Sequence, residues 1–294
     1  MILLEGNILA KEIKKKLIDL KPAIFPDPNV YLAILLFDGN KASETYVKLK
    51  EKYAADIGIQ AKVFRGPIET FTDAIELIKT LNNDPLCIGI VPQLPFSRPL
   101  SINKQLIIDS IDPSKDVDGL GVVITGQNQL GITDFLPATV RGIFSLLDYY
   151  NLGDIKGKKV VIIGQSNLIG KPLAIQCLKL GAEVIAFDIN DHSDTIIQHC
   201  QNAEYIFSCT GDLNFVKKNF TREDGNQVII DAGYGFIEGK AVGDVDFDGV
   251  APYVKAITPV PGGVGPLTVA SLFSNLFDLH IHHGGHQFSP QISL

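Results

Sequence analysis

Short apolar runs alternate with segments of helical periodicity along most of this chain. In the first half, the runs at 31–37, 59–66 and 87–95 predict strands, and the segments at 42–58 and 70–84 predict the helices between them. Two parallel strands need a long crossover connection, usually a helix, so this alternation is typical of parallel sheets. The chain is therefore expected to adopt an α/β fold.

A second alternating block follows an apolar helical segment at 135–150. Three of its predicted strands end in glycine, and ligands of doubly wound sheets bind at the C-terminal ends of the strands. We expect two domains with a cleft between them: an N-terminal α/β domain at 1–140 plus 270–294, and a doubly wound, Rossmann-like domain at 141–269. The predicted strands of the second block are VVIIG (160–164), EVIAFD (183–188), YIFSCTG (205–211) and QVIIDAG (227–233), and a loop rich in proline and glycine at 257–268 precedes a predicted helix at 269–279.

The composition is that of a globular protein. The 294 residues are 46% hydrophobic and 20% charged, which supplies enough core material for two domains. The net charge of −7 argues against nucleic-acid binding, which normally needs a basic face. The N-terminus lacks the order of a signal peptide, and no apolar run approaches the roughly 18 residues that span a bilayer. We expect a soluble cytoplasmic protein with neither nucleic-acid nor membrane partners.

The cysteines do not show the spacing of a metal site. Cys87, Cys177, Cys200 and Cys209 are scattered, and we interpret them as reduced thiols. The histidine-rich tail at 280–294 could chelate metal, but a mobile terminus is the favoured interpretation. No metal cofactor is predicted.

The segment VVIIGQSNLIGKP (160–172) reads as a strand that enters a phosphate-binding turn. It departs from G-x-G-x-x-G, because Ser166 replaces the second glycine and Gly170 comes one residue late. Gly164 permits a tight turn, and Gly170 permits close packing of helix on strand. The alternative is an ordinary strand–helix turn. Binding of a dinucleotide is favoured because Thr210-Gly211 and Ala232-Gly233 follow later strands that would border the same crevice.

Several motifs together resemble one enzyme family. They are SETYVKLKEKYAADIGI (43–59), IVPQLPF (90–96), PSKDVDGL (113–120), IGQSNLIGKPLA (163–174), GDVDFDGV (243–250) and ITPVPGGVGPLT (257–268). With these motifs the chain resembles the bifunctional methylenetetrahydrofolate dehydrogenase/methenyltetrahydrofolate cyclohydrolase family, from near its first residue to about residue 279.

The resemblance implies two reactions on tetrahydrofolate derivatives. The dehydrogenase transfers a hydride from 5,10-methylenetetrahydrofolate to a nicotinamide, and the cyclohydrolase opens the methenyl product with water to 10-formyltetrahydrofolate. The resemblance places both reactions between a folate-binding N-terminal domain and the Rossmann domain, and it implies a homodimer.

The resemblance also implies the catalytic residues. Tyr46 packs on the folate and Lys50 is the principal acid/base, which near neutral pH requires a lowered lysine pKa. The two residues are four positions apart, so they share one helix face. Gln93 is the implied partner of the amine, where a carboxylate would instead raise the lysine pKa. Asp118 is implied to hold the pterin through two hydrogen bonds.

Further binding residues follow from the same resemblance. Glycines in the loop at 257–268 would let backbone approach the folate. The implied substrate-binding residues also include Leu94, Pro261, Gly262, Gly263, Pro266 and Thr268. The implied cofactor-binding residues are Gly164, Gln165, Ser166, Gly170, Asp188, Ser193, Thr210, Gly211, Gly233 and Tyr234.

Two departures from the family pattern favour NAD over NADP. Gln165 stands where NADP-binding members have an arginine that grips the 2′-phosphate. The segment 187–195 contains three aspartates and no Lys or Arg. Asp188 lies where an acid hydrogen-bonds the adenosine ribose in NAD enzymes, and a carboxylate there repels a phosphate. NADP remains the alternative cofactor.

Other departures do not remove a proposed catalytic group. Ala138 and Val140 replace a cysteine and a proline of the family pattern, and Pro92 replaces a valine. Alternatives are an enzyme with dehydrogenase activity only and a non-catalytic folate- or dinucleotide-binding relative. Without the family context, Lys50 is a solvated helix lysine and Asp118 a turn aspartate. A shikimate- or amino-acid-dehydrogenase-like enzyme would explain the two domains but not the loop at 257–268.

Overall fold

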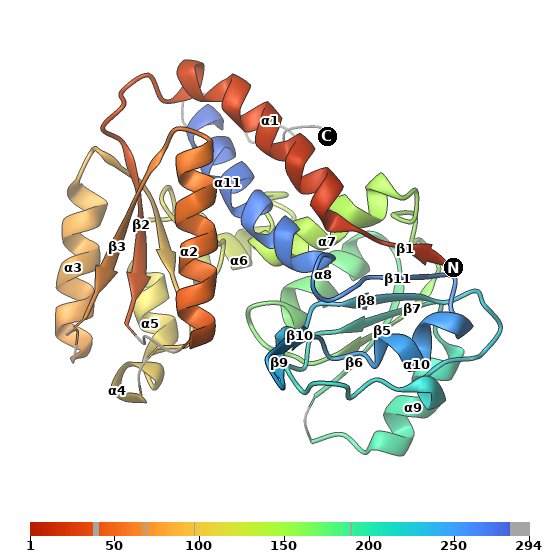
Figure 1. Ribbon diagram of the computed structural model, residues 1–294. Coiled ribbons are helices and arrows are strands. Elements are labelled where there is room, and N and C mark those ends of the chain that lie inside the picture. The colour runs from red at the N-terminus through yellow and green to blue at the C-terminus, as the bar shows by residue number, and fades with distance from the viewer. Residues whose placement is uncertain (38–40, 67, 69, 97, 189, 283–294) are drawn as a thin grey trace. The chain divides into compact units, whose positions relative to one another are not determined.

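The chain forms two compact units. The three-stranded unit comprises Glu12–Ala138 and Val269–Leu294, and the six-stranded unit comprises Met1–Lys11 and Thr139–Thr268. Helices α1 (Gly6–Ile24) and α11 (Val264–His282) each contribute residues to both units. The structure is a computed structural model that describes residues 1–37, 41–66, 68, 70–96, 98–188 and 190–282 (Figure 1).

The strands of the three-stranded unit run parallel in the order β3-β2-β4. The strands and helices predicted in the first half of the chain are confirmed. The central strand β2 is buried along its whole length, which explains its unbroken apolar sequence. The elements are β2 (Tyr31–Leu36), α2 (Lys41–Asp56), β3 (Gln60–Arg65), α3 (Phe71–Asn83), β4 (Cys87–Pro92), α4 (Arg98–Ser101), α5 (Lys104–Asp109) and α6 (Val122–Gln129).

Helices cover both faces of this sheet (Figure 1). Successive side chains of a strand point to opposite faces, so Tyr31 and Leu35 share one face of β2 and pack with Ile78 of α3. Helix α2 contacts β2 and β3 from the other face. Tyr53 of α2 stacks on Phe273 of α11, with 4.8 Å between the ring centroids. Helix α2 is therefore held between the sheet and another helix.

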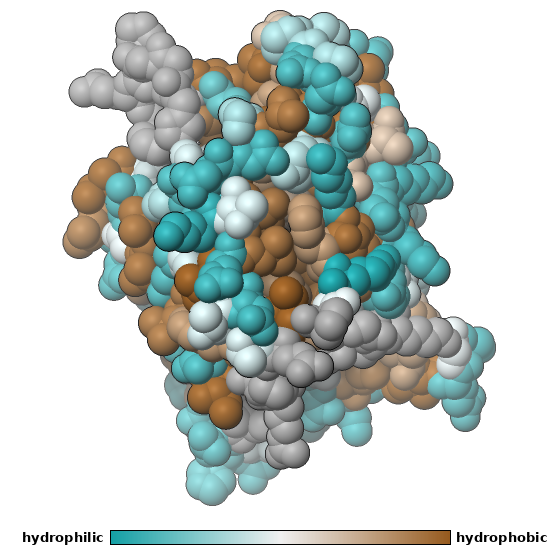
Figure 2. Space-filling view, turned by 90° about the vertical axis from the view of Figure 1, so that its left-hand side faces the viewer, coloured by the Kyte–Doolittle hydropathy of each residue, from teal (hydrophilic) through white to brown (hydrophobic). Residues whose placement is uncertain are grey.

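The outer strand of this unit carries polar side chains. Strand β3 lies at an edge of the sheet, and its exposed residues are Gln60, Lys62 and Arg65. Charged residues on an edge strand oppose pairing with the sheet of another molecule. Figure 2 shows a face on which hydrophilic and hydrophobic residues are mixed.

The last helix begins earlier than the sequence pattern predicted. The prediction placed it at 269–279, whereas α11 spans Val264–His282. The last five residues of the predicted loop at 257–268 are therefore helical. Pro266 is tolerated as the third helical residue because the first N–H groups of a helix have no intrahelical acceptor.

A buried asparagine of α11 holds two loops of the three-stranded unit. Asn275 is fully buried, and its Nδ2 donates hydrogen bonds to the carbonyl oxygens of Val117 and Leu136, each at 3.0 Å. Val117 directly precedes Asp118 in the chain. The position of Asp118 therefore depends on a contact that is distant in sequence.

The six-stranded unit has a parallel sheet in the order β1-β11-β8-β7-β5-β6, which confirms the doubly wound prediction. The chain passes from β5 to β6 on one side, and then to β7 on the other side of β5. The ends of β5 and β7 therefore form a topological switch point, where such sheets bind ligands. The elements are β1 (Ile2–Leu3), α7 (Ala138–Tyr149), β5 (Lys159–Ile163), α8 (Gly170–Lys179), β6 (Glu183–Phe187), α9 (Ser193–Asn202), β7 (Tyr205–Ser208), η1 (Lys218–Phe220), β8 (Val228–Asp231), the hairpin β9 (Gly235–Ile237) and β10 (Lys240–Val242), α10 (Phe247–Val250), η2 (Ala251–Tyr253) and β11 (Ala256–Ile257).

The first strand was not anticipated from the sequence. β1 pairs in parallel with β11, so Met1–Lys11 belong to the six-stranded unit, whereas the prediction assigned them to the domain at 1–140. The pattern of two residues is too short to reveal a strand, and the pairing joins segments from opposite ends of the chain.

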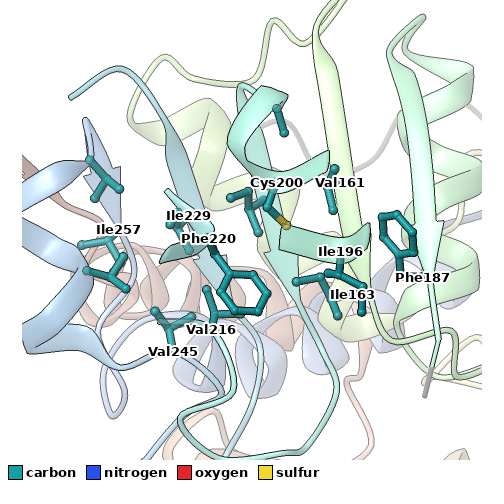
Figure 3. Close-up of a cluster of buried hydrophobic side chains, with 14 of the residues drawn as sticks. Val161, Ile163, Phe187, Ile196, Cys200, Val216, Phe220, Ile229, Val245 and Ile257 are labelled. Atoms are coloured by element: carbon teal, nitrogen blue, oxygen red, sulfur yellow. The ribbon is translucent and has the colours of Figure 1, made fainter. Parts of the chain in front are cut away.

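An apolar cluster covers one face of the six-stranded sheet (Figure 3). Val161 and Ile163 of β5 pack there with Ile196 and Cys200 of α9. Helix α8 contacts β5 and β6 from the other face. Coverage of both faces explains why the inner strands consist mainly of apolar residues.

We predict that Asn275→Ala destabilises the protein by about 2 to 4 kcal/mol, because two buried carbonyl oxygens lose their donor. Urea unfolding measures the free energy of unfolding. The matched control is Asn83→Ala, since Asn83 donates one exposed hydrogen bond to the carbonyl of Lys79; its effect should stay below about 0.5 kcal/mol. Equal effects of the two substitutions would contradict the role given to Asn275.

Candidate active site

A lysine lies buried in the three-stranded unit. Lys50 is on α2, and its side chain is only 6% exposed. Its Nζ donates a hydrogen bond of 2.9 Å to Oε1 of Gln93. Burial lowers the pKa of Lys50, and the negative charge of Asp118 partly opposes that change. The environment therefore favours a neutral amine more than water does, which suits a group that exchanges protons.

Gln93 is held at the carboxyl end of the parallel sheet. It follows β4 directly, and its backbone N–H donates to the carbonyl of Leu35 at 2.9 Å. Its side-chain Nε2 donates to the carbonyl of Leu94 at 3.1 Å. This second bond leaves the amide oxygen directed at Lys50. A neutral acceptor satisfies the amine without adding a charge that would raise the lysine pKa.

A tightly bonded loop carries the half-buried Asp118. Burial raises the pKa of Asp118, and the charge of Lys50 counteracts the rise. Its neighbour Asp116 is buried and accepts N–H bonds from Gly119 at 3.0 Å and Gly121 at 2.7 Å. Burial raises the pKa of Asp116 to about 6 despite these bonds. The loop is thus folded around one carboxylate while presenting the other.

The structure brings Lys50, Gln93 and Asp118 together. Tyr46 is half-buried and precedes Lys50 by one turn of α2, so the two side chains share a helix face. Lys50 is not the solvated helix lysine that its sequence context alone suggested. The sequence analysis did not single out Asp116. The pattern that could have revealed it is an aspartate followed three and five residues later by glycines, whose N–H groups its carboxylate binds.

Apart from Leu94, which follows Gln93 in the three-stranded unit, the remaining predicted substrate residues lie in the six-stranded unit. Pro261 is exposed, and Gly262 has a φ of +111°, which favours glycine. Gly263 donates its N–H to the carbonyl of Pro259 at 2.9 Å, and Pro266 lies in the first turn of α11. Thr268, two residues further along α11, donates its hydroxyl to the hydroxyl of Thr139 at 3.3 Å.

The turn after β5 has no room for side chains at its glycines. Gly164 has a φ of +102°, and a Cβ there would lie 2.4 Å from the carbonyl oxygen of Cys209. A Cβ on Gly170, the first residue of α8, would lie 1.8 Å from the carbonyl oxygen of Gly164. Between them, Gln165 is half-buried and Ser166 exposed. Helix α8 thus begins directly against the strand end, as a dinucleotide-binding turn requires.

Two further predicted cofactor residues follow β6 in the chain. The N–H of Gly164 donates to the carbonyl of Phe187 at 2.8 Å, which places the end of β6, and Asp188 after it, beside the turn. Asp188 is exposed, and so is Ser193 at the start of α9.

The turns after β7 and β8 carry the last predicted cofactor residues. The N–H groups of Thr210 and Gly211 donate to Oδ2 of Asp244, at 2.7 and 3.2 Å. The N–H of Gly233 donates to Oδ1 of Asp231 at 2.8 Å, and the adjacent Tyr234 is half-buried. These two aspartates were not singled out from the sequence.

Within the described ranges, every helix is too short or too polar to span a lipid bilayer. In the same ranges, no group of three His, Cys, Asp or Glu side chains could hold a metal ion. All four cysteines are free thiols, as predicted. The histidine-rich tail lies outside the described residues from 283 onward.

Two family models match the chain. The tetrahydrofolate dehydrogenase/cyclohydrolase catalytic domain matches residues 4–118, and the NAD(P)-binding domain of the same family matches residues 137–283. The chain is 41% identical over 274 residues to "Bifunctional protein FolD 2" of Lactobacillus johnsonii, covering 92% of this chain and 94% of that protein.

Solved structures of the same family are similar to this chain over almost its whole length. The bifunctional dehydrogenase/cyclohydrolase of Campylobacter jejuni has a TM-score of 0.89 and 37% identity, covering 96% of this chain and 99% of that one. The Trypanosoma brucei enzyme, solved with NADP and an inhibitor, has a TM-score of 0.88 and 28% identity, covering 96% and 98%. With two family models matching more than half of its residues, the chain belongs to the tetrahydrofolate dehydrogenase/cyclohydrolase family.

Proposed function

We propose that this protein oxidises 5,10-methylenetetrahydrofolate with a nicotinamide dinucleotide and hydrolyses the methenyl product to 10-formyltetrahydrofolate. The observation that carries the proposal is the buried amine of Lys50, hydrogen-bonded to the neutral amide of Gln93 at 2.9 Å. A lysine buried away from water and hydrogen-bonded to a neutral amide serves proton transfer better than stability, because burying an ammonium costs free energy.

Lys50 handles the protons of the hydrolysis. Water adds to the methenyl carbon, and then one carbon–nitrogen bond breaks. The neutral amine accepts a proton from the attacking water, which leaves a hydroxyl group on the methenyl carbon. The ammonium then returns a proton to the departing ring nitrogen, and the hydroxyl proton is released to solvent as the formyl C=O forms. The lowered pKa of Lys50 makes both forms accessible nearer to neutral pH.

The other groups of the three-stranded unit position the substrate. Asp118 accepts hydrogen bonds from the aminopyrimidine edge of the pterin, a pairing that favours its ionised form. The ring of Tyr46 packs against the folate one helical turn from the amine. The hydrogen bond to Gln93 fixes the position of Nζ of Lys50. The amine therefore exchanges protons with the bound substrate in a defined direction.

The six-stranded unit suits a dinucleotide. Gly164 and Gly170 leave no space for a Cβ, and α8 begins at the switch point of the sheet. Backbone N–H groups at the start of α8 would hold the pyrophosphate, with Gln165 and Ser166 beside it. When bound, the nicotinamide accepts the hydride from the methylene carbon.

We propose NAD as the preferred dinucleotide, with NADP as the alternative. Gln165 cannot neutralise a 2′-phosphate, and Asp188 follows β6 beside Gly164. From the family resemblance, we also propose a homodimer that acts in the cytoplasm. Sedimentation of the purified protein and fractionation of cells test these two points.

We predict that Lys50→Met lowers cyclohydrolase activity by about 100-fold or more, because the proton-transfer group is lost. The decay of methenyltetrahydrofolate absorbance measures the rate, and circular dichroism checks that the variant is folded. Lys48→Met is the control, since Lys48 lies on the same helix but is exposed. A folded Lys50→Met variant with normal hydrolysis would refute the assignment.

We predict that Gln93→Glu shifts the pH–rate profile to higher pH. A carboxylate at this distance from Nζ stabilises the ammonium, so the pKa of Lys50 rises and the neutral fraction at a given pH falls. The alkaline displacement should be about one pH unit or more. Gln60→Glu adds the same charge at an exposed position and should leave the profile in place. An acid-side displacement for Gln93→Glu would contradict the proposed pairing.

We predict that the protein has a higher kcat/KM with NAD than with NADP, and that Asp188→Ser raises the NADP value roughly tenfold by removing a like charge from the 2′-phosphate. Paired initial rates with methylenetetrahydrofolate test this. Asp154→Ser is the control, because Asp154 is exposed and precedes β5 at the opposite end of the strand. A clear preference of the unmodified protein for NADP overturns the cofactor assignment.

A further inference from the structure

Two buried aspartates lie at the carboxyl end of the six-stranded sheet, and neither has a role in the reactions above. Asp231 is the last residue of β8 and is 2% exposed; Asp244 follows the hairpin β9–β10 and is fully buried. Buried carboxylates are costly unless donors surround them. Their contacts show which parts of the structure they hold.

Asp244 holds the turn that follows β7. Its Oδ2 accepts hydrogen bonds from the hydroxyl of Ser208 at 3.1 Å, the N–H of Thr210 at 2.7 Å and the N–H of Gly211 at 3.2 Å. One carboxylate oxygen therefore restrains both peptide groups at the tip of the turn. The other oxygen, Oδ1, accepts no hydrogen bond from the described residues.

This restraint reaches the turn after β5. The N–H and C=O of a trans peptide point in opposite directions, so fixing the N–H of Thr210 directs the carbonyl of Cys209 away from Asp244. That carbonyl oxygen lies 2.4 Å from the place where a Cβ of Gly164 would be. The aspartate consequently sets the spacing between the two turns at the switch point.

Asp231 fixes the backbone of Asp244 through hydrogen bonds. Its carboxylate accepts N–H bonds from Gly233 at 2.8 Å, Asp244 at 3.0 Å and Val245 at 2.9 Å. Its own N–H donates to the hydroxyl of Thr258 at 2.7 Å, after β11. Burial raises the pKa of Asp231 to about 6, so the group is still ionised at neutral pH and accepts all three bonds.

Two glycines pack closely against the carboxylates of Asp231 and Asp244. A Cβ on Gly233 would lie 2.0 Å from Oδ1 of Asp244, and a Cβ on Gly243 would lie 2.1 Å from Oδ2 of Asp231. Both glycines therefore pack directly on the carboxylates. The turns after β7, β8 and β11 form one cross-linked rim.

We propose that Asp244, held in place by Asp231, is a positioning residue for the dinucleotide. It keeps the turn Ser208–Gly211 at a fixed distance from Gly164, so that the crevice at the switch point is already open before the ligand arrives. A rim that is ordered in advance costs less free energy to occupy. The inference rests on the proposed cofactor residues Thr210, Gly211 and Gly233.

The test combines three variants of the full-length protein with NAD as the probe. Asp244→Ala removes all three bonds and should raise the Kd for NAD, measured by calorimetry, roughly tenfold or more. Asp244→Asn keeps an oxygen in place of Oδ2, so its Kd should stay within about threefold of the unmodified value. Ser208→Ala removes one bond of three and serves if Asp244→Ala does not fold; it should raise the Kd about threefold.

The matched control separates positioning from general stability. Gln227 is a fully buried polar residue at the opposite end of β8, where its side chain bonds the carbonyls of Cys200 and Ala203. Gln227→Ala should lower the Tm without changing the Kd for NAD. Hydrogen exchange without NAD adds an independent measurement: the amides of Thr210 and Gly211 should exchange roughly tenfold faster in Asp244→Ala.

The outcomes are distinct. An unchanged Kd in folded Asp244→Ala, or an equal rise in Gln227→Ala, overturns this inference while leaving the proposed function intact. Failure of the unmodified protein to bind NAD or NADP overturns both. A raised Kd in Asp244→Ala, with recovery in Asp244→Asn and normal hydrolysis of methenyltetrahydrofolate, supports it, since the hydrolysis needs no dinucleotide.

Discussion

The parallel direction of the strands is the constraint on which both units depend. In the three-stranded and six-stranded sheets, all neighbouring strands of the described residues pair in parallel, so the carboxyl ends of the strands meet at one edge. Gln93 follows β4 at such an edge, and Gly164 follows β5 at the other. Residues far apart in the sequence thereby become neighbours, and the chemistry of each unit is assembled from strand ends rather than from one segment.

The two units stabilise buried charge differently. In the three-stranded unit, Lys50 has a neutral amide as its hydrogen-bond partner, and burial keeps its pKa low. In the six-stranded unit, Asp231 and Asp244 are surrounded by backbone N–H groups. An amine beside an amide can gain and lose a proton, whereas carboxylates that accept several backbone N–H bonds hold the backbone in place. The contrast follows the proposed division between proton transfer and ligand positioning.

The Asp116–Asp118 loop combines both uses within three residues. The carboxylate of Asp116 accepts hydrogen bonds from the N–H groups of Gly119 and Gly121, and these bonds give the loop its shape. Asp118 remains half-buried and responds to the charge of Lys50. Asn275 adds a restraint from α11 through the carbonyl of Val117. The conformation of this short acidic motif therefore depends on hydrogen bonds within the loop and on the contact with α11.

The sequence by itself determined the α/β class, most strands and helices, and the doubly wound arrangement, because apolar periodicity is a local property of the chain. Through the family resemblance, its motifs also predicted Lys50, Gln93 and Asp118 as site residues before any geometry was known. The tertiary structure decided what local patterns cannot encode: that β1 pairs with β11, that α11 begins at Val264, and that Lys50 is buried against Gln93. It also gave Asp116, Asp231 and Asp244 their partners, since hydrogen bonds between distant strand ends exist only after the sheets have formed.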